Sequence, residues 1–110
     1  MAKGEYLGEF EHLVILALLR LEEGAYGVTV RREIEERTDR EVSIGAIYAT
    51  LDRLESKGYV KSHVGEPTPE RGGRAKRHFR VTPKGITAVK RTHEVIRTMA
   101  DGLSVARSLA

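Results

Sequence analysis

The sequence predicts a mainly α-helical protein with one small β-hairpin. Apolar residues recur at three- and four-residue spacing in four stretches, as they do in helices with one buried face. Between the third and fourth stretches, two short runs alternate apolar with polar residues, which is typical of half-buried strands. The 110 residues suffice for one modest domain with one core, and a chain this short is expected to gain further burial from a partner subunit.

The first helix is predicted over residues 7–21. It is apolar on nearly every face, so it needs cover on several sides. Its apolar run, LVILALL, is far too short to span a bilayer, and the polar, acidic opening MAKGEYLGEFEH lacks the pattern of a signal peptide. We therefore expect a cytoplasmic protein with no membrane partner. The second helix, over residues 28–38, carries a narrow apolar stripe of Val30 and Ile34 and is expected to rest on the surface of the core.

The third helix is predicted to begin after Ser43, which is a good N-cap residue. Val42 before the cap and Ile47 after it fit a hydrophobic staple. The helix is expected to continue to about Lys57 and to stop at Gly58. Four aliphatic residues share the face that is expected to be buried: Ile44, Ile47, Leu51 and Leu54.

The hairpin is predicted from the runs YVKSHVGE and RHFRVT, with Phe79 and Val81 on its inner face. A long loop rich in glycine, proline and arginine joins the two strands. Thr82 and Pro83 then open the last helix, as N-cap and first helical residue. One apolar stripe of about five turns follows: Ile86, Val89, His93, Ile96, Met99 and Leu103.

Three helices followed by a two-stranded wing describe a winged helix-turn-helix, here with an additional C-terminal dimerisation helix. The boundary is expected near residue 82, with a DNA-binding domain over 1–82 and the dimerisation helix over 83–110, in one structural unit. In this architecture the third helix enters the DNA major groove and the wing reaches the adjacent backbone. The region from Arg71 to Arg91 supports this interpretation, because it holds eight Lys or Arg residues and no acid.

The expected DNA contacts come from the wing and from the third helix. The wing cations would neutralise phosphates; they are Arg71, Arg74, Lys76 and Arg77. Gly45, Ala46 and Ala49 on the outer face are small enough for a close approach to the groove floor, with Thr50 beside them as a possible contact to thymine methyls. Arg53 is the long side chain expected to reach guanine, or else to pair with Glu55, Glu36 or Asp52. Ser43 and Tyr48 are expected to hydrogen-bond to phosphates.

At the level of whole motifs the chain resembles the PadR family of bacterial and archaeal transcription regulators. The resemblance covers about residues 7–90 and is carried by GEFEHLVILALL, GAYGVTVRREIEERT, SIGAIYATLDRLESKGYVKS and GGRAKRHFRVTPKG. It implies a homodimer in which the first and last helices pack across a two-fold axis and each third helix meets half of a palindromic operator. The implied dimer residues are Phe10, Leu13, Ile86, Val89, His93, Ile96, Met99 and Leu103. Some short members hold flat drugs between tryptophans at this interface; an effector there is possible, but this chain has no tryptophan.

Other classes of function have less support. There is no cysteine, and the serines lack a recognisable base and orienting acid, so catalysis and a cofactor are not expected. The histidines, His12, His63, His78 and His93, do not form a zinc pattern, and no metal is expected. We expect a sequence-specific regulator of double-stranded DNA, most naturally a repressor. The alternatives are a winged-helix adaptor for other proteins and a non-specific architectural DNA binder.

Overall fold

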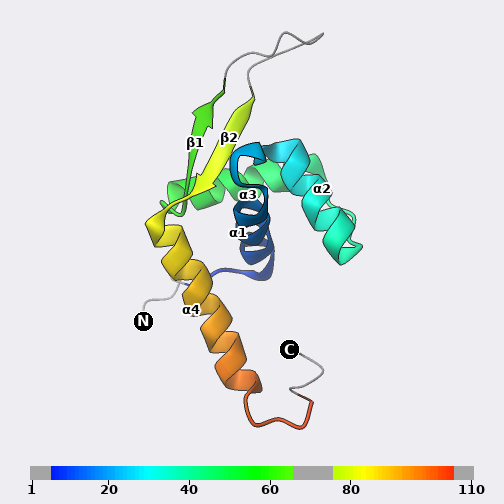
Figure 1. Cartoon of the computed structure of the whole chain (residues 1–110), viewed down its shortest axis with the longest axis vertical. Helices are drawn as coiled ribbons and strands as arrows, with labels where there is room; N and C mark the ends of the chain where they lie inside the picture. Colours follow the sequence, from blue (N-terminus) through cyan, green and yellow to red (C-terminus); the bar gives the residue numbers. More distant parts are fainter. Residues whose placement is uncertain (1–5, 66–75, 106–110) are drawn as a thin grey trace.

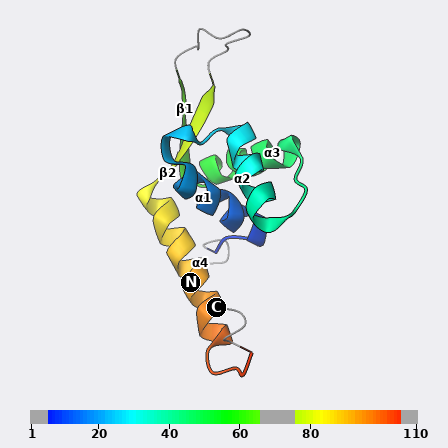
Figure 2. The same cartoon turned by 45° about the vertical axis from the view of Figure 1, so that its right-hand side comes forward.

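The computed structural model describes residues 6–65 and 76–105, and it confirms a winged helix (Figure 1). The chain runs through α1 (Glu9–Leu21), a 3-10 turn η1 (Glu22–Gly24), α2 (Gly27–Thr38) and α3 (Ile44–Ser56). The hairpin of β1 (Val60–Val64) and β2 (Arg77–Val81) follows, and then α4 (Pro83–Ala100). The hairpin projects from one end of the three-helix body and α4 from the other (Figures 1 and 2).

The helix ends follow the predicted local signals. The Ser43 Oγ accepts a hydrogen bond from the Ala46 N–H at 3.1 Å, and the Thr82 Oγ1 accepts one from the Gly85 N–H at 3.1 Å. Gly58 follows α3 with a φ of +80°, which a residue with a side chain rarely adopts. The first helix begins two residues later than predicted, because its N-cap, Gly8, has an extended backbone and Leu7 is buried ahead of it.

The core lies where α1, α3 and the hairpin meet. Its largest fully buried side chains come from all three, and they include Ile15 of α1, Leu51 of α3 and Phe79 of β2. α1 runs through the middle of the body and contacts α2, α3, β2 and α4, as its apolar sequence predicts. Leu16 and Leu19 nevertheless stay exposed in the single chain.

The two strands pair antiparallel, from Val60 opposite Val81 to Val64 opposite Arg77. The Phe79 N–H donates to the Ala25 carbonyl oxygen at 2.9 Å, which ties β2 to the segment between η1 and α2. This bond and the buried Phe79 side chain hold the base of the wing firmly beside the helices.

α4 is divided into two halves. Its first half packs on the body and buries Gly85, Ala88, Val89 and Thr92. Val89 is 8% exposed and belongs to the subunit's own core, so little of its side chain is left for the predicted contact with a partner. The second half extends past the body (Figure 2), and no helix among residues 6–65 and 76–105 has the length and apolar character needed to cross a membrane.

Candidate nucleic-acid interface

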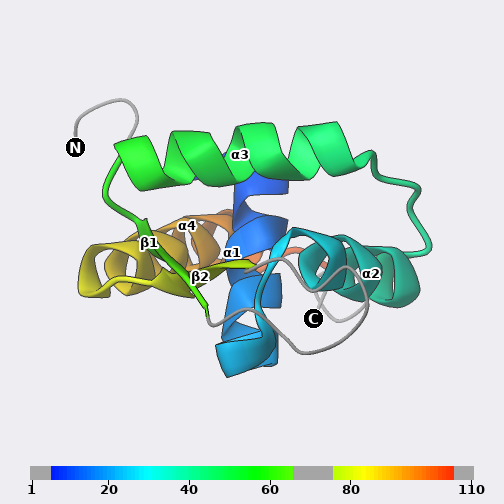
Figure 3. The ribbon, with the colours of Figure 1, turned by 90° about the horizontal axis from the view of Figure 1, so that it is seen from above.

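The outer face of α3 is open. Burial of Ile47, Leu51 and Leu54 turns the opposite side of the helix outward, and Figure 3 shows α3 lying along one side of the molecule with no other described element over it. The small residues Gly45 and Ala49 lie on this outward side and are exposed. A helix with so little side-chain volume on its outer face can bring its backbone close to the floor of a major groove.

Most of the predicted α3 contacts are exposed, as a surface role requires: Ser43, Gly45, Ala46, Tyr48, Ala49 and Arg53. Tyr48 leans over the first residue of α2, where a Cβ on Gly27 would collide with its ring. Gly27 therefore makes room for the position of Tyr48. Thr50 differs from the prediction: it is 2% exposed and packs inward, so its side chain cannot meet a ligand on the outer face.

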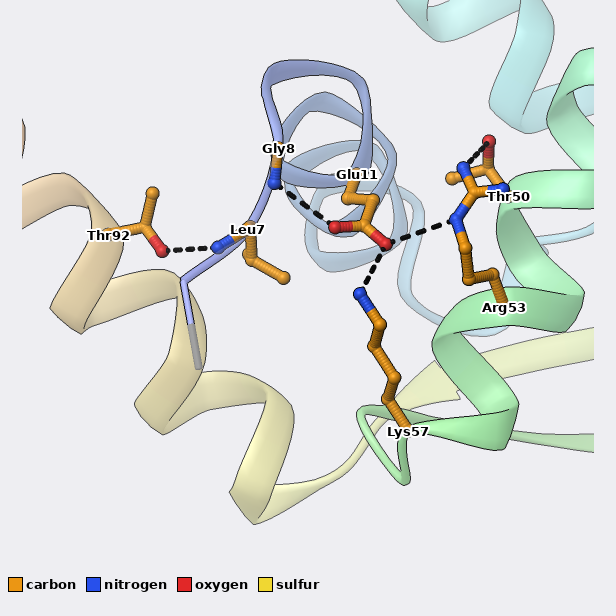
Figure 4. A network of polar contacts seen from close by, with 7 residues as sticks. All are labelled: Leu7, Gly8, Glu11, Thr50, Arg53, Lys57 and Thr92. Atoms are coloured by element: carbon orange, nitrogen blue, oxygen red, sulfur yellow. Dashed lines mark hydrogen bonds and ion pairs between the residues drawn. The ribbon is translucent and has the colours of Figure 1, made fainter. Parts of the chain in front are cut away.

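Glu11 binds two cations of α3 (Figure 4). This carboxylate of α1 is 7% exposed, and its Oε2 accepts from Lys57 Nζ at 2.9 Å and from Arg53 Nε at 3.3 Å. Its Oε1 accepts from the Gly8 N–H at 3.1 Å. Burial raises the pKa of Glu11, but the bonds from Lys57, Gly8 and Arg53 together hold it below its ordinary value. Arg53 thus has an acidic partner, but this partner is Glu11 of α1 and none of the three acids predicted, Glu55, Glu36 and Asp52.

The two residues before α1, Leu7 and Gly8, connect α3 to α4. The Leu7 N–H donates to the buried Thr92 Oγ1 of α4 at 2.9 Å, next to the Gly8 N–H that holds Glu11 (Figure 4). The position of the Glu11 carboxylate is therefore fixed by α4 on one side and fixes Arg53 and Lys57 on the other. This arrangement links the last helix to the exposed helix through a short buried path.

Arg77 joins the wing to α3. Its Nη1 lies 3.1 Å from Asp52 Oδ1, and its Nη2 lies 2.5 Å from Glu55 Oε1. Glu55 also accepts from the backbone N–H and the hydroxyl of Ser62 in β1, at 3.0 and 2.6 Å. The Ser62 hydroxyl is the main cause that lowers the pKa of Glu55, and Arg77 contributes. Arg77, which was predicted to neutralise a phosphate, is thus paired with two carboxylates of α3, and its contact with phosphate stays a prediction.

The remaining predicted wing residues lie partly outside the described residues. Lys76 is described: its Nζ lies 4.5 Å from the centre of the Tyr26 ring and 3.3 Å from the Tyr26 hydroxyl. Arg71 and Arg74 fall in the segment that is not described, so their role stays a prediction.

The DNA contacts predicted from the sequence did not include three acids of this region: Glu11, Asp52 and Glu55. Glu11 does carry a signal in the sequence, because it is an acid inside a helix that is otherwise almost entirely apolar. Such a group is buried only with partners. Its partners, however, are more than forty residues away along the chain, and no local pattern identifies them.

The histidines of the hairpin lie away from this face. His63 and His78 are paired across the strands with stacked rings 5.5 Å apart. Within the described parts of the chain, no group of three or more metal-binding side chains comes together.

The comparisons with known proteins agree with one another. The sequence profile of the transcriptional regulator PadR-like family matches residues 15–91. No curated protein matches the chain. A transcriptional regulator from Clostridium thermocellum is 27% identical with a TM-score of 0.68, over 90% of this chain and 91% of its own.

Two further solved structures are similar. RosR from H. salinarum is 26% identical with a TM-score of 0.67, over 93% of this chain and 84% of its own. A PadR family transcription regulator from Clostridium difficile has a TM-score of 0.69 over 92% of this chain and 99% of its own; at 23% identity it supports the fold.

Proposed function

Because the chain belongs to the PadR-like family of transcriptional regulators, we propose that it is a repressor that binds a palindromic DNA operator as a homodimer. Membership in the family makes it a DNA-binding transcription regulator. The homodimer, the palindrome and the repression are the further steps that we propose.

The observation that carries the proposal is the open outer face of α3 beside the wing. An adaptor that binds other proteins through this helix would be expected to expose apolar anchors on it. The outer line here holds Gly45, Ala49 and Asp52, which suit close approach to a polar groove. The N-terminus of α3 adds first-turn backbone N–H groups that have no partner within the helix backbone, and such groups favour phosphate.

The second half of α4 supports a dimer. Ile96 and Met99 are 60% and 77% exposed on a helix that extends beyond the body. Leu103 beyond the helix is exposed as well, and so is His93. Apolar side chains in such a row are rarely left in water by a soluble protein, and a second copy would cover them. Of the predicted dimer residues, Phe10, Leu13 and Ile86 are half-buried in the single chain and would contribute at the edge of that contact.

Ala49→Glu tests the proposal directly. Operators are first selected from a random duplex pool with the parent protein, and affinity is then measured by fluorescence anisotropy at several salt concentrations. A carboxylate at this exposed position would meet the phosphates and the groove, so we expect a loss of at least about tenfold, worth about 1.4 kcal/mol. Affinity of the parent should fall steeply with salt.

Thr98→Glu is the matched control, because it adds the same charge on an exposed position of α4. We expect this variant to bind like the parent. Repression is measured by transcription from a promoter that carries the selected operator, which should decrease when the protein is added. Parental affinity of Ala49→Glu for the operator would contradict the proposed use of α3, and a selected pool without a consensus would favour an architectural binder.

A further inference from the structure

We propose that Asp52 reads a base of the operator: its carboxylate accepts a hydrogen bond from the N4 amino group of a cytosine in the major groove, while Arg77 of the wing holds it in place. This inference rests on the proposed DNA-binding function and specifies which base the third helix recognises. It concerns a residue that the sequence alone suggested only as a partner for Arg53.

Asp52 occupies the right place on α3. It lies three residues after Ala49 and seven after Gly45, so the three residues form one line along the outer face of the helix. Its side chain is 62% exposed. Since Gly45 and Ala49 allow the helix backbone to approach closely, a short side chain in the same line can reach a base edge.

The carboxylate is positioned in advance. Asp52 Oδ1 is bound to Arg77 Nη1 at 3.1 Å, and the same guanidinium is held by Glu55. Glu55 is fixed in turn by two hydrogen bonds from Ser62. In the described part of the chain Asp52 Oδ2 has no hydrogen-bond partner, so one oxygen orients the group and the other is available to a ligand.

The charge of Arg77 also makes an acid tolerable at this face. A bare carboxylate among phosphates would be repelled, whereas the adjacent guanidinium offsets its charge. Glu55, the other acid of this cluster, already uses its oxygens on Ser62 and Arg77. Asp52 is therefore the acid of the pair that remains able to bind a base.

The chemistry of an ionised carboxylate selects the base. It accepts hydrogen bonds and donates none, so it is repelled by the acceptors of guanine and thymine, and also by adenine N7, which lies beside the N6 amino donor of that base. Cytosine presents its N4 amino donor in the major groove, and Asp is one of the residues that pair with it. The ion pair between Asp52 and Arg77 is not explained by folding stability, because ion pairs between side chains as exposed as these contribute little to the free energy of unfolding.

The experiment compares the parent with Asp52→Ala, Asp52→Asn and the control Asp101→Asn, which removes the same charge at the end of α4. Each protein selects from a random duplex pool, and its affinity is then measured by anisotropy, at one fixed salt concentration, for the parent consensus and for its single-base variants. Circular dichroism melting checks that each variant is folded.

We expect the parent to prefer cytosine at one position in each half-site by roughly tenfold. Asp52→Ala should lose the preference at this position and keep the others. Asp52→Asn should shift the preference toward adenine, which an amide can bind by two hydrogen bonds. The Asp101→Asn control should select the parent consensus.

Two outcomes would overturn the inference, and they differ. If the parent selects a consensus and Asp52→Ala selects the same one, with affinity changed equally for all duplexes, Asp52 acts only through its charge while the proposed function stands. If the parent selects no consensus, sequence-specific binding itself is wrong and the inference falls with it.

Discussion

Replacing Glu11 by Gln probes the buried link between α1 and α3. The substitution keeps the size of the side chain and removes its charge. A glutamine carbonyl oxygen can still accept from the Gly8 N–H, but the carboxylate that binds Lys57 at 2.9 Å and Arg53 at 3.3 Å is lost. The amide nitrogen would then face an ammonium group, which it cannot bind.

The expected cost follows from the burial of each partner. Removing one member of a fully buried ion pair costs about 3–5 kcal/mol. Here only Glu11 is buried; the side chains of Arg53 and Lys57 are 53% and 35% exposed and can regain water. We therefore expect a smaller loss, about 2 kcal/mol, as for a hydrogen bond to a charged group. For a domain of this size that corresponds to a melting temperature lower by roughly 10 °C.

Urea and thermal unfolding followed by circular dichroism provide the measurement, at equal protein concentration because unfolding of a dimer depends on it. The pH dependence is a second readout. The pKa of Glu11 is lower in the folded protein than its ordinary value of 4.5, so the stabilisation is present above that value. It is lost as the pH falls through the lowered folded value, and the gap between parent and variant should close there.

One control variant isolates the effect of Glu11. Glu9→Gln lies on the same helix and breaks an ion pair with Arg40 at 3.0 Å, but the Glu9 side chain is 77% exposed, so we expect a loss below about 1 kcal/mol.

Burial, with His93 nearby, lowers the pKa of His12, so acid also destabilises the fold through His12, equally in both proteins. Equal stability of parent and Glu11→Gln at pH 7, or a gap unchanged in acid, would refute the reasoning.

Two further predictions concern packing and assembly. In Gly85→Ala the new Cβ would collide with the Tyr59 carbonyl oxygen and lie 2.8 Å from Val81 Cγ1, so we expect a loss of about 1–3 kcal/mol by urea unfolding. Gly45→Ala, with no atom within 4 Å of the new Cβ, should be neutral or stabilising by up to about 1 kcal/mol; similar losses in both variants would disprove the role of the Gly85 contact. Ile96→Glu should convert the proposed dimer to monomer in analytical ultracentrifugation at micromolar concentration, whereas Thr98→Glu should not; a dimer that survives Ile96→Glu would place the contact elsewhere.

The elements of this fold could be predicted because their signals are local. The Ser43 and Thr82 caps, the glycine after α3 and the apolar spacing of Ile47, Leu51 and Leu54 each act within a few residues of the chain. The order of helices and hairpin then restricts the architecture to few choices, and a winged helix is one of them. The outer face of α3 follows from the same periodicity, since the side opposite the buried residues must face outward.

The pairing of charges on that face could not be predicted in the same way. Arg53 bonds to a carboxylate 42 residues earlier, and Arg77 bonds to one 25 residues earlier. Thr50 lies near the edge of the apolar stripe, and only the packing of α3 on the body determined that it turns inward. The division of α4 into a packed and a projecting half likewise depends on tertiary contacts: Thr92, which binds the Leu7 N–H just before α1 begins, is the last buried residue of α4.

The helices, the hairpin, the open face of α3 and the basic charge of the wing region follow from the amino-acid sequence alone, because propensity, capping and periodicity depend on near neighbours. The packed fold was needed to show which cations are already bound by acids, which stripe residues belong to the core and which oxygen of Asp52 remains available. These depend on distances of about 3 Å between side chains from separate elements, and such distances are fixed only when the elements dock.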